Sequence, residues 1–254
     1  MSVKKISGLA VVFVVFLLVF AIALLPASVA LQWFKEELPP GLQLGPATGT
    51  LWQGQVHGVR YQGQYVSKVK WQVQPLALLQ GQLNTDLVVG NKRNTNEISA
   101  QGQLLYGLFN KQLQLNDAQA RLSLEQVLQR VRLPLPTEAK GRVFMELDNY
   151  QLGEPHCQEL SGTISSADIS VKGRNGWFSI GELEGDLSCV NGAAKVTVTK
   201  ENRLGLQVDA GFNDRGQFSV NGFIKPDASL PKDVHDAVQF LGAQGADGRY
   251  RINF

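Results

Sequence analysis

The chain has 254 residues, with 24 Lys and Arg against 22 Asp and Glu. Only Lys4 and Lys5 precede a long apolar segment near the N-terminus, so the remainder holds 22 basic and 22 acidic residues and is formally neutral. Because nucleic-acid binding depends on a basic excess that neutralises phosphates, this balance excludes a nucleic-acid partner. The length is enough to bury a sizeable core in one large domain or two small ones.

The segment 6–31, ISGLAVVFVVFLLVFAIALLPASVAL, contains no charged residue. Because about 20 apolar residues in a helix span the hydrocarbon core of a bilayer, the sequence predicts a transmembrane helix here. The two lysines before it place the tip, residues 1–5, in the cytoplasm and the rest of the chain outside. We therefore expect a single-pass membrane protein with residues 32–254 outside the cytoplasm.

A cleaved signal peptide is the alternative for the same segment, since Ser28 and Ala30 flank one residue in the small-x-small pattern that a signal peptidase cuts. The apolar region of a signal peptide usually has about 7 to 15 residues. The uninterrupted run 9–25 is longer. An uncleaved anchor is therefore the favoured interpretation.

Residues 32–46 are rich in Pro and Gly and are expected to form an irregular stalk. Beyond them the dominant period is two: Val69, Trp71 and Val73 alternate with polar residues, which is typical of a half-buried strand. The same alternation recurs around residues 83–89, 113–115, 143–147, 196–198, 204–212, 218–220 and 250–254. The predicted fold is mainly β: an antiparallel, curved, meandering sheet that forms a groove or a partial barrel.

Two short helices interrupt this pattern. SLEQVLQRV offers Ser123 as the N-cap with Gln126 three residues later, which is a capping box. KDVHDAVQFL follows Pro231 and precedes Gly242, so its ends carry ordinary start and stop residues.

The Pro-rich stretch around Pro134 and Pro136 is the best internal boundary. It divides a first β half, residues 47–133, from a second β half, residues 134–254, which contains both cysteines.

The stretch GTLWQG, residues 49–54, places Trp52 between two glycines. A phosphate-binding loop needs such glycines to lead into a helix and a Lys followed by Ser or Thr, and neither follows here. The apolar phase of the following residues reverses at Gly58, which indicates a β-bulge. We therefore predict a strand, with Trp52 in the core or at the lip of a groove.

Cys157 and Cys189 are the two cysteines, and both belong to the exported part. An even count in an oxidising compartment predicts one disulfide between them. Two unlinked buried thiols are the alternative. Metal ligation would need further ligands, and there is no CxxC or HxxxH motif to supply them.

Catalytic signatures are missing. His57, His156 and His235 belong to different predicted elements, and no GxSxG or HExxH motif occurs. Acidic residues alternate along GELEGDL, residues 181–187, which is typical of a solvated strand face, with divalent cation binding as a minor alternative. We expect no enzyme, no cofactor and no metal site.

The chain resembles the protein N family of the bacterial type II secretion system. The resemblance covers the full length and is carried by GTLWQGQV, by VKWQVQPLALLQGQL with Trp71 and Pro75, and by the two cysteines on either side of Trp177. It implies a non-catalytic, periplasm-facing inner-membrane subunit that contributes to export of folded proteins across the outer membrane. Its partners would be other type II secretion subunits.

Two questions stay open at this point. Trp52 and Trp71 are candidate partner contacts, but both are equally compatible with a core position. The pattern of strands with isolated glycines also resembles the AsmA-like periplasmic β-groove proteins, so lipid is an alternative partner. A lipid carrier is expected to line an open groove with aliphatic side chains from end to end, whereas an assembly subunit is expected to close its core.

Overall fold

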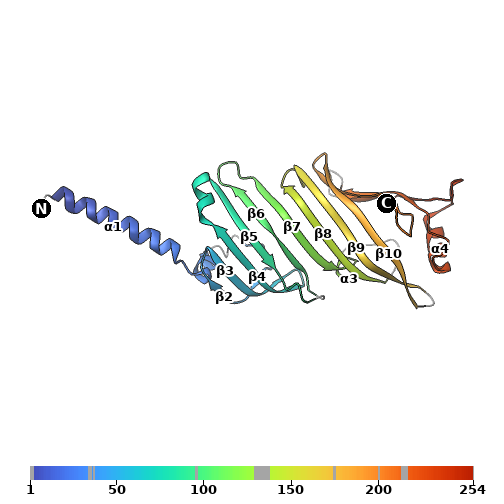
Figure 1. Cartoon of the computed structure of the whole chain (residues 1–254), viewed down its shortest axis with the longest axis horizontal. Coiled ribbons are helices and arrows are strands. Elements are labelled where there is room, and N and C mark those ends of the chain that lie inside the picture. Colours follow the sequence, from blue (N-terminus) through green and yellow to red (C-terminus); the bar gives the residue numbers. More distant parts are fainter. Residues whose placement is uncertain are drawn as a thin grey trace.

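A single antiparallel sheet dominates the structure (Figure 1). The computed structural model describes residues 3–33, 36, 38–94, 97–128, 138–173, 176–199, 201–212 and 217–253. Within them the sheet has 14 strands, and from β3 to β14 each strand pairs with the next one along the chain. The short strands β1 and β2 both pair with β3 at one edge. The predicted antiparallel meander is therefore confirmed, and the sheet is an open one.

The strands are β1 Gln43–Leu44, β2 Ala47–Gly49, β3 Gln53–Tyr61, β4 Gln64–Gln74, β5 Gln82–Val89, β6 Ser99–Gly107, β7 Leu113–Ser123, β8 Ala139–Gln151, β9 Glu159–Gly173, β10 Gly176–Val190, β11 Ala193–Val198, β12 Gln207–Phe212, β13 Phe218–Ile224 and β14 Tyr250–Asn253. The helical elements are α1 Val3–Ala23, α2 Ala27–Trp33, the 3₁₀ helix η2 Pro75–Gln80, α3 Leu124–Leu128, α4 Lys232–Val238 and the 3₁₀ helix η3 Gln239–Leu241.

Tight turns explain why neighbours in the sequence are neighbours in the sheet. Gln62 and Gly63, between β3 and β4, both have positive φ, and so do Asn191 and Gly192 between β10 and β11. Two central residues of positive φ match the right-handed twist of the strands on either side. Each such turn therefore returns the chain directly alongside the strand that it has just left.

The apolar segment 6–31 forms two helices. α1 ends at Ala23, Pro26 makes an isolated β-bridge with Thr50, and α2 follows. In α2, Ala27 and Ala30 are buried, and the helix contacts β2 and β3. The last part of the segment is thus packed on the edge of the sheet. Among the described residues, no helix combines the length and apolar character that crossing a membrane requires.

The expected stalk, residues 32–46, contains some regular structure. Trp33 closes α2, and Gln43–Leu44 forms β1 against β3. Residues 34, 35 and 37 lie outside the described part of the chain.

The prediction that GTLWQG is a strand is wrong for its centre. Gly49 ends β2, β3 begins at Gln53, and the residues between them form the turn. Gly49 and Gly54 are opposite each other across this turn, and Gly49 has a φ of 90°. The glycines therefore permit a tight turn that reverses the chain, and the strand propensity of the surrounding residues does not reveal this turn.

The predicted bulge at Gly58 is also absent. Val56 pairs with Val69 and Val59 pairs with Val66, so the register between β3 and β4 is the same on both sides of Gly58. Gly58 instead has a φ of 75°. No inserted residue accompanies the change in apolar phase at this position.

Both predicted short helices are present. The backbone N–H of Gln126 donates to Ser123 Oγ at 3.3 Å, which is one of the two bonds of a capping box. α4 begins after Pro231, and η3 extends it to Leu241. Pro134 and Pro136 lie outside the described residues, and β7 pairs with β8 on either side of that segment.

Candidate functional site

The sheet has one apolar and one polar face. Residues directly opposite each other in an antiparallel pair point to the same side of the sheet. Following the register from β4 to β11 identifies the residues of one side, here called the apolar face: Val69, Trp71, Leu87, Leu104, Leu115, Ala118, Met145, Leu147, Ile164, Leu187 and Val196. The same registers place polar residues on the other side: Lys70, Gln72, Asp86, Gln101, Gln103, Asn116, Gln119, Glu146, Thr163, Asp186 and Thr197.

The polar face satisfies its own groups through local pairs. Lys195 Nζ lies 3.0 Å from Asp209 Oδ1, and the Thr197 hydroxyl donates to the same carboxylate at 2.8 Å. The hydrogen bond from Lys195, followed by that from Thr197, holds the pKa of Asp209 below its ordinary value. Because these side chains are partly exposed, such pairs add little stability. The polar face is a solvated surface.

The apolar face is only partly covered. In the part of the chain that the structure describes, the strands from β4 to β11 contact chiefly their own neighbours in the sheet. Leucines of this face, such as Leu87, Leu104 and Leu187, are therefore only half-buried. A sheet with one apolar face ordinarily packs it against a second layer. This one leaves much of that face accessible.

At the C-terminal end the same face is closed. Val238 of α4 and Leu241 of η3 pack with Ile224 and Ile252, which belong to β13 and β14. Val208 and Val220 join the same cluster from β12 and β13. The helix thus covers the last strands and leaves the apolar face open from β4 to β11. This arrangement is neither the closed core expected of an assembly subunit nor a groove that is open from end to end.

Trp71 lies at the N-terminal end of the apolar face. Its ring lies over Gly54 of β3, where an added Cβ would approach the ring to 2.4 Å. The indole N–H donates to the backbone carbonyl of Leu51 at 2.9 Å. Trp71 is half-buried, so it fills the gap left by a glycine and also contributes to the accessible face.

Trp52 joins the sheet to α1. Its indole N–H donates to the carbonyl oxygen of Ile22 at 3.0 Å, and its own carbonyl accepts the N–H of Val73 at 2.7 Å. The half-buried side chain of Trp52 lines an apolar cleft of about 340 Å³ together with Val19, Ile22, Ala23 and Pro75. The structure therefore places the two tryptophans on neighbouring elements, with each indole N–H satisfied within the chain.

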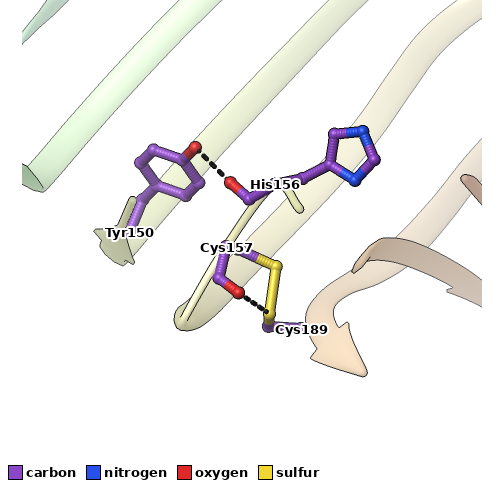
Figure 2. Close-up of a disulfide and its surroundings, with 4 residues drawn as sticks. All are labelled: Tyr150, His156, Cys157 and Cys189. Carbon is purple, nitrogen blue, oxygen red and sulfur yellow. Dashed lines mark hydrogen bonds between the residues drawn. A yellow bond between two sulfur atoms is a disulfide. The ribbon is translucent and has the colours of Figure 1, made fainter. Parts of the chain in front are cut away.

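The predicted disulfide is present between Cys157 and Cys189 (Figure 2). It links the loop after β8 to the end of β10, and Cys157 is 1% exposed. The backbone N–H groups of His156 and Cys157 donate to the Gly192 carbonyl, and Tyr150 Oη donates to the His156 carbonyl at 2.7 Å. The disulfide and these bonds together fix one end of the sheet.

Side chains suited to catalysis or metal binding are scattered. His57 lies on β3, His156 beside the disulfide and His235 in α4. Among the described residues, no three His, Cys, Asp or Glu side chains come together in a way that could hold a metal ion. The accessible apolar face is therefore the strongest candidate for a functional surface.

Sequence reasoning missed part of this surface. Ile164 on β9 and Leu187 on β10 belong to it, but β9 carries Ser and Gly at many positions where an aliphatic residue would reveal the alternation. Short stretches of alternation, LSGTI at residues 160–164 and GELEGDL at residues 181–187, are a signal that could have found these strands, but they cover only fragments of two strands of 15 residues each.

Comparison with known proteins gives one consistent result. A family model described as type II secretion system (T2SS), protein N matches residues 40–253. A type II secretion system protein N of Vibrio cholerae serotype O1 is 30% identical over 257 residues, covering 98% of each chain. The protein of the same name from Aeromonas hydrophila is 27% identical over 255 residues, covering 97% of this chain and 96% of the relative. No solved structure matches significantly.

Replacing Gly54 tests the packing of Trp71. Gly54→Ala should lower the free energy of unfolding by about 1 to 3 kcal/mol, because the methyl group displaces the Trp71 ring. Thermal unfolding followed by tryptophan fluorescence measures this. In a Trp71→Ala background the same change should cost less. An equal cost in both backgrounds would contradict the packing described here.

Removing the disulfide tests its structural role. The double variant Cys157→Ser, Cys189→Ser should lose about 3 to 4 kcal/mol of stability in the loop-entropy model, since the bond closes a long loop. Denaturant unfolding of the purified protein measures the loss, and reduction of the unaltered chain should give a matching value. Peptide mass mapping that finds free thiols or a link between two chains would contradict the assignment.

Proposed function

The chain belongs to the type II secretion system protein N family, and from this premise we propose that it is a non-catalytic, periplasm-facing accessory subunit of that system. It contributes to the export of folded proteins by contact with other subunits. The observation that carries this proposal is the accessible apolar face from β4 to β11, which offers a large surface for contact, while the described residues offer no catalytic constellation.

The apolar face is the proposed contact surface. Its central leucines, Leu104 and Leu147, are half-buried by their neighbours in the sheet and keep apolar area in contact with water. Covering the rest of one such side chain is worth about 1 kcal/mol, at about 25 cal/mol per Å² of apolar surface. Trp71 at the end of this face is the aromatic anchor, and Trp52 supports it from the turn before β3.

We place α1 in the inner membrane, with residues 32–254 in the periplasm. From Val11 to Phe20 the side chains of α1 are apolar and more than half exposed on every side, as Val11, Phe13, Phe16 and Phe20 illustrate at 58–66%. A helix that is apolar all round is stable when apolar surroundings cover it. The disulfide supports the periplasmic placement, because such bonds persist in an oxidising compartment.

The lipid-handling alternative shares the open aliphatic face with this proposal. The comparisons give it no support, and α4 closes the face over the last strands. We therefore propose protein contact as the role of the face.

A pair of substitutions on β6 tests the contact surface. Leu104→Glu places a charge on the apolar face, whereas Gln101→Glu places one on the polar face of the same strand, where Lys92 Nζ lies 2.6 Å from the Gln101 side chain. We expect Leu104→Glu to abolish co-purification with other secretion subunits and to reduce export of folded proteins, while Gln101→Glu changes neither. Thermal unfolding of both variants checks that the sheet is intact.

Equal behaviour of the two variants in a folded protein would contradict the proposed surface. If deletion of the whole gene left export intact and altered outer-membrane permeability, the lipid-handling alternative would replace the secretion proposal.

Protease added to spheroplasts tests the membrane placement. We expect digestion of residues 32–254 while the N-terminal helix stays with the membrane fraction, because α1 lies in the bilayer and the sheet lies outside it. A protein that washes off membranes, or one whose mature chain begins at Leu31, would contradict it.

A further inference from the structure

Two neighbouring turns at one end of the sheet expose large apolar side chains. Leu76 and Leu79 of η2 are 76% and 85% exposed, and Phe109 in the turn between β6 and β7 is 89% exposed. Leu108, beside Phe109, is 46% exposed. We call these four residues the apolar rim. They lie in η2 and in the turn after β6, beyond the ends of the strands, so the rim is separate from the apolar face.

The backbone holds the rim in place. The N–H of Leu108 donates to the carbonyl of Gly81, which directly follows η2, at 2.9 Å. The Phe109 ring lies against Gly81, where an added Cβ would come within 2.1 Å of the ring. Gly81 has a φ of 72°, which suits glycine. η2 and the turn after β6 therefore form one surface, whose apolar side chains are exposed and whose backbone is joined by a hydrogen bond.

The rim carries no charge. Residues 71–85 and 98–110 contain no Asp, Glu, Lys or Arg, and the first charged residue after the rim is Lys111, which is exposed. Exposed leucine and phenylalanine with a lysine beside them are typical of segments that lie in the boundary between headgroups and acyl chains of a membrane.

The rim also lies close to α1. Pro75, the first residue of η2, shares the apolar cleft of Trp52 with Val19 and Ile22 of α1. The Trp52 indole bonds to the Ile22 carbonyl and so fixes the end of that helix to the sheet. In Figure 1, α1 joins the sheet at the end opposite to α4. The exposed apolar surface of α1 is thus continuous, through this cleft, with the start of the rim.

We propose that the apolar rim enters the surface of the membrane that holds α1. The partner is a lipid surface, recognised by burial of Leu76, Leu79 and Phe109 among the acyl chains near the headgroups. This inference rests on the membrane placement of α1 under the proposed function. A single helix leaves the sheet free to rotate about the helix axis, and the rim supplies a second point of attachment that removes this freedom.

Site-specific fluorescence tests the proposal with the full chain reconstituted in vesicles of phosphatidylethanolamine and phosphatidylglycerol. An environment-sensitive label is attached at Leu79→Cys. The two native cysteines are joined in the disulfide, so the introduced cysteine is the thiol that reacts with the label. The matched control is Phe240→Cys on η3, which is 77% exposed and lies at the other end of the sheet. We expect a blue shift and quenching by nitroxide-labelled lipid for Leu79→Cys only. Adding Phe109→Asp should return the quenching at Leu79→Cys toward the control level.

The possible outcomes distinguish failure of the rim proposal from failure of the membrane placement of α1. If the chain floats with the vesicles and both labels stay in water, the rim proposal is wrong and the anchor stands. If the chain does not float with the vesicles at all, the placement of α1 has failed and the rim proposal falls with it. If the Leu79→Cys label is shielded only when another secretion subunit is added, the rim is a protein contact and the lipid proposal is overturned. A thermal unfolding midpoint unchanged by Phe109→Asp shows that the loss of quenching is not due to misfolding.

Discussion

Backbone pairing between successive strands is the interaction on which the structure depends. In an open sheet of one layer, each interior strand must satisfy its N–H and C=O groups through the two strands beside it, and here those are its neighbours in the chain. Side-chain burial is limited, because few residues between β4 and β11 are fully buried. Cohesion therefore comes from the ladders and from contacts between adjacent side chains on one face. Such a sheet is stable without closing a core, and for that reason its apolar face can stay available.

The ends of the sheet are protected by different means. At the N-terminal edge, β1, β2 and α2 pack on β3, and Trp52 and Trp71 tie this edge to α1 and to β4. At the C-terminal end α4 and η3 cover β12 to β14 with the one compact cluster of buried side chains found in the described residues. An uncovered sheet edge invites pairing with other chains. β1 and β2 occupy the edge of β3, whereas α4 and η3 cover the face of the last strands.

The sequence revealed the fold where alternation was clear and failed where it was not. Val69, Trp71 and Val73 identified β4, and two cysteines in a chain expected to be exported identified the disulfide. By contrast, β9 was missed because bulges and serines break its period. From Lys140 to Arg142 on β8 the paired residue of β9 changes from Ser170 to Ala167, so β9 carries one extra residue there. The open apolar face was not predictable from one chain. The alternation of apolar and polar residues along a strand indicates that one face is apolar, but it does not indicate whether another element covers that face.

The two proposed contact surfaces can act together because they point in different directions. Side chains of the apolar face stand perpendicular to the sheet, whereas the rim lies at the ends of β4 to β7, in the plane of the sheet. In the proposed arrangement the rim inserts into the membrane surface, so the membrane contacts the sheet at the ends of its strands. The apolar face then looks out parallel to the membrane surface. A partner subunit anchored in the same membrane would approach from that direction. Holding the sheet in one orientation reduces the rotational freedom lost on association, so attachment of the rim would strengthen contact at the face without touching the partner.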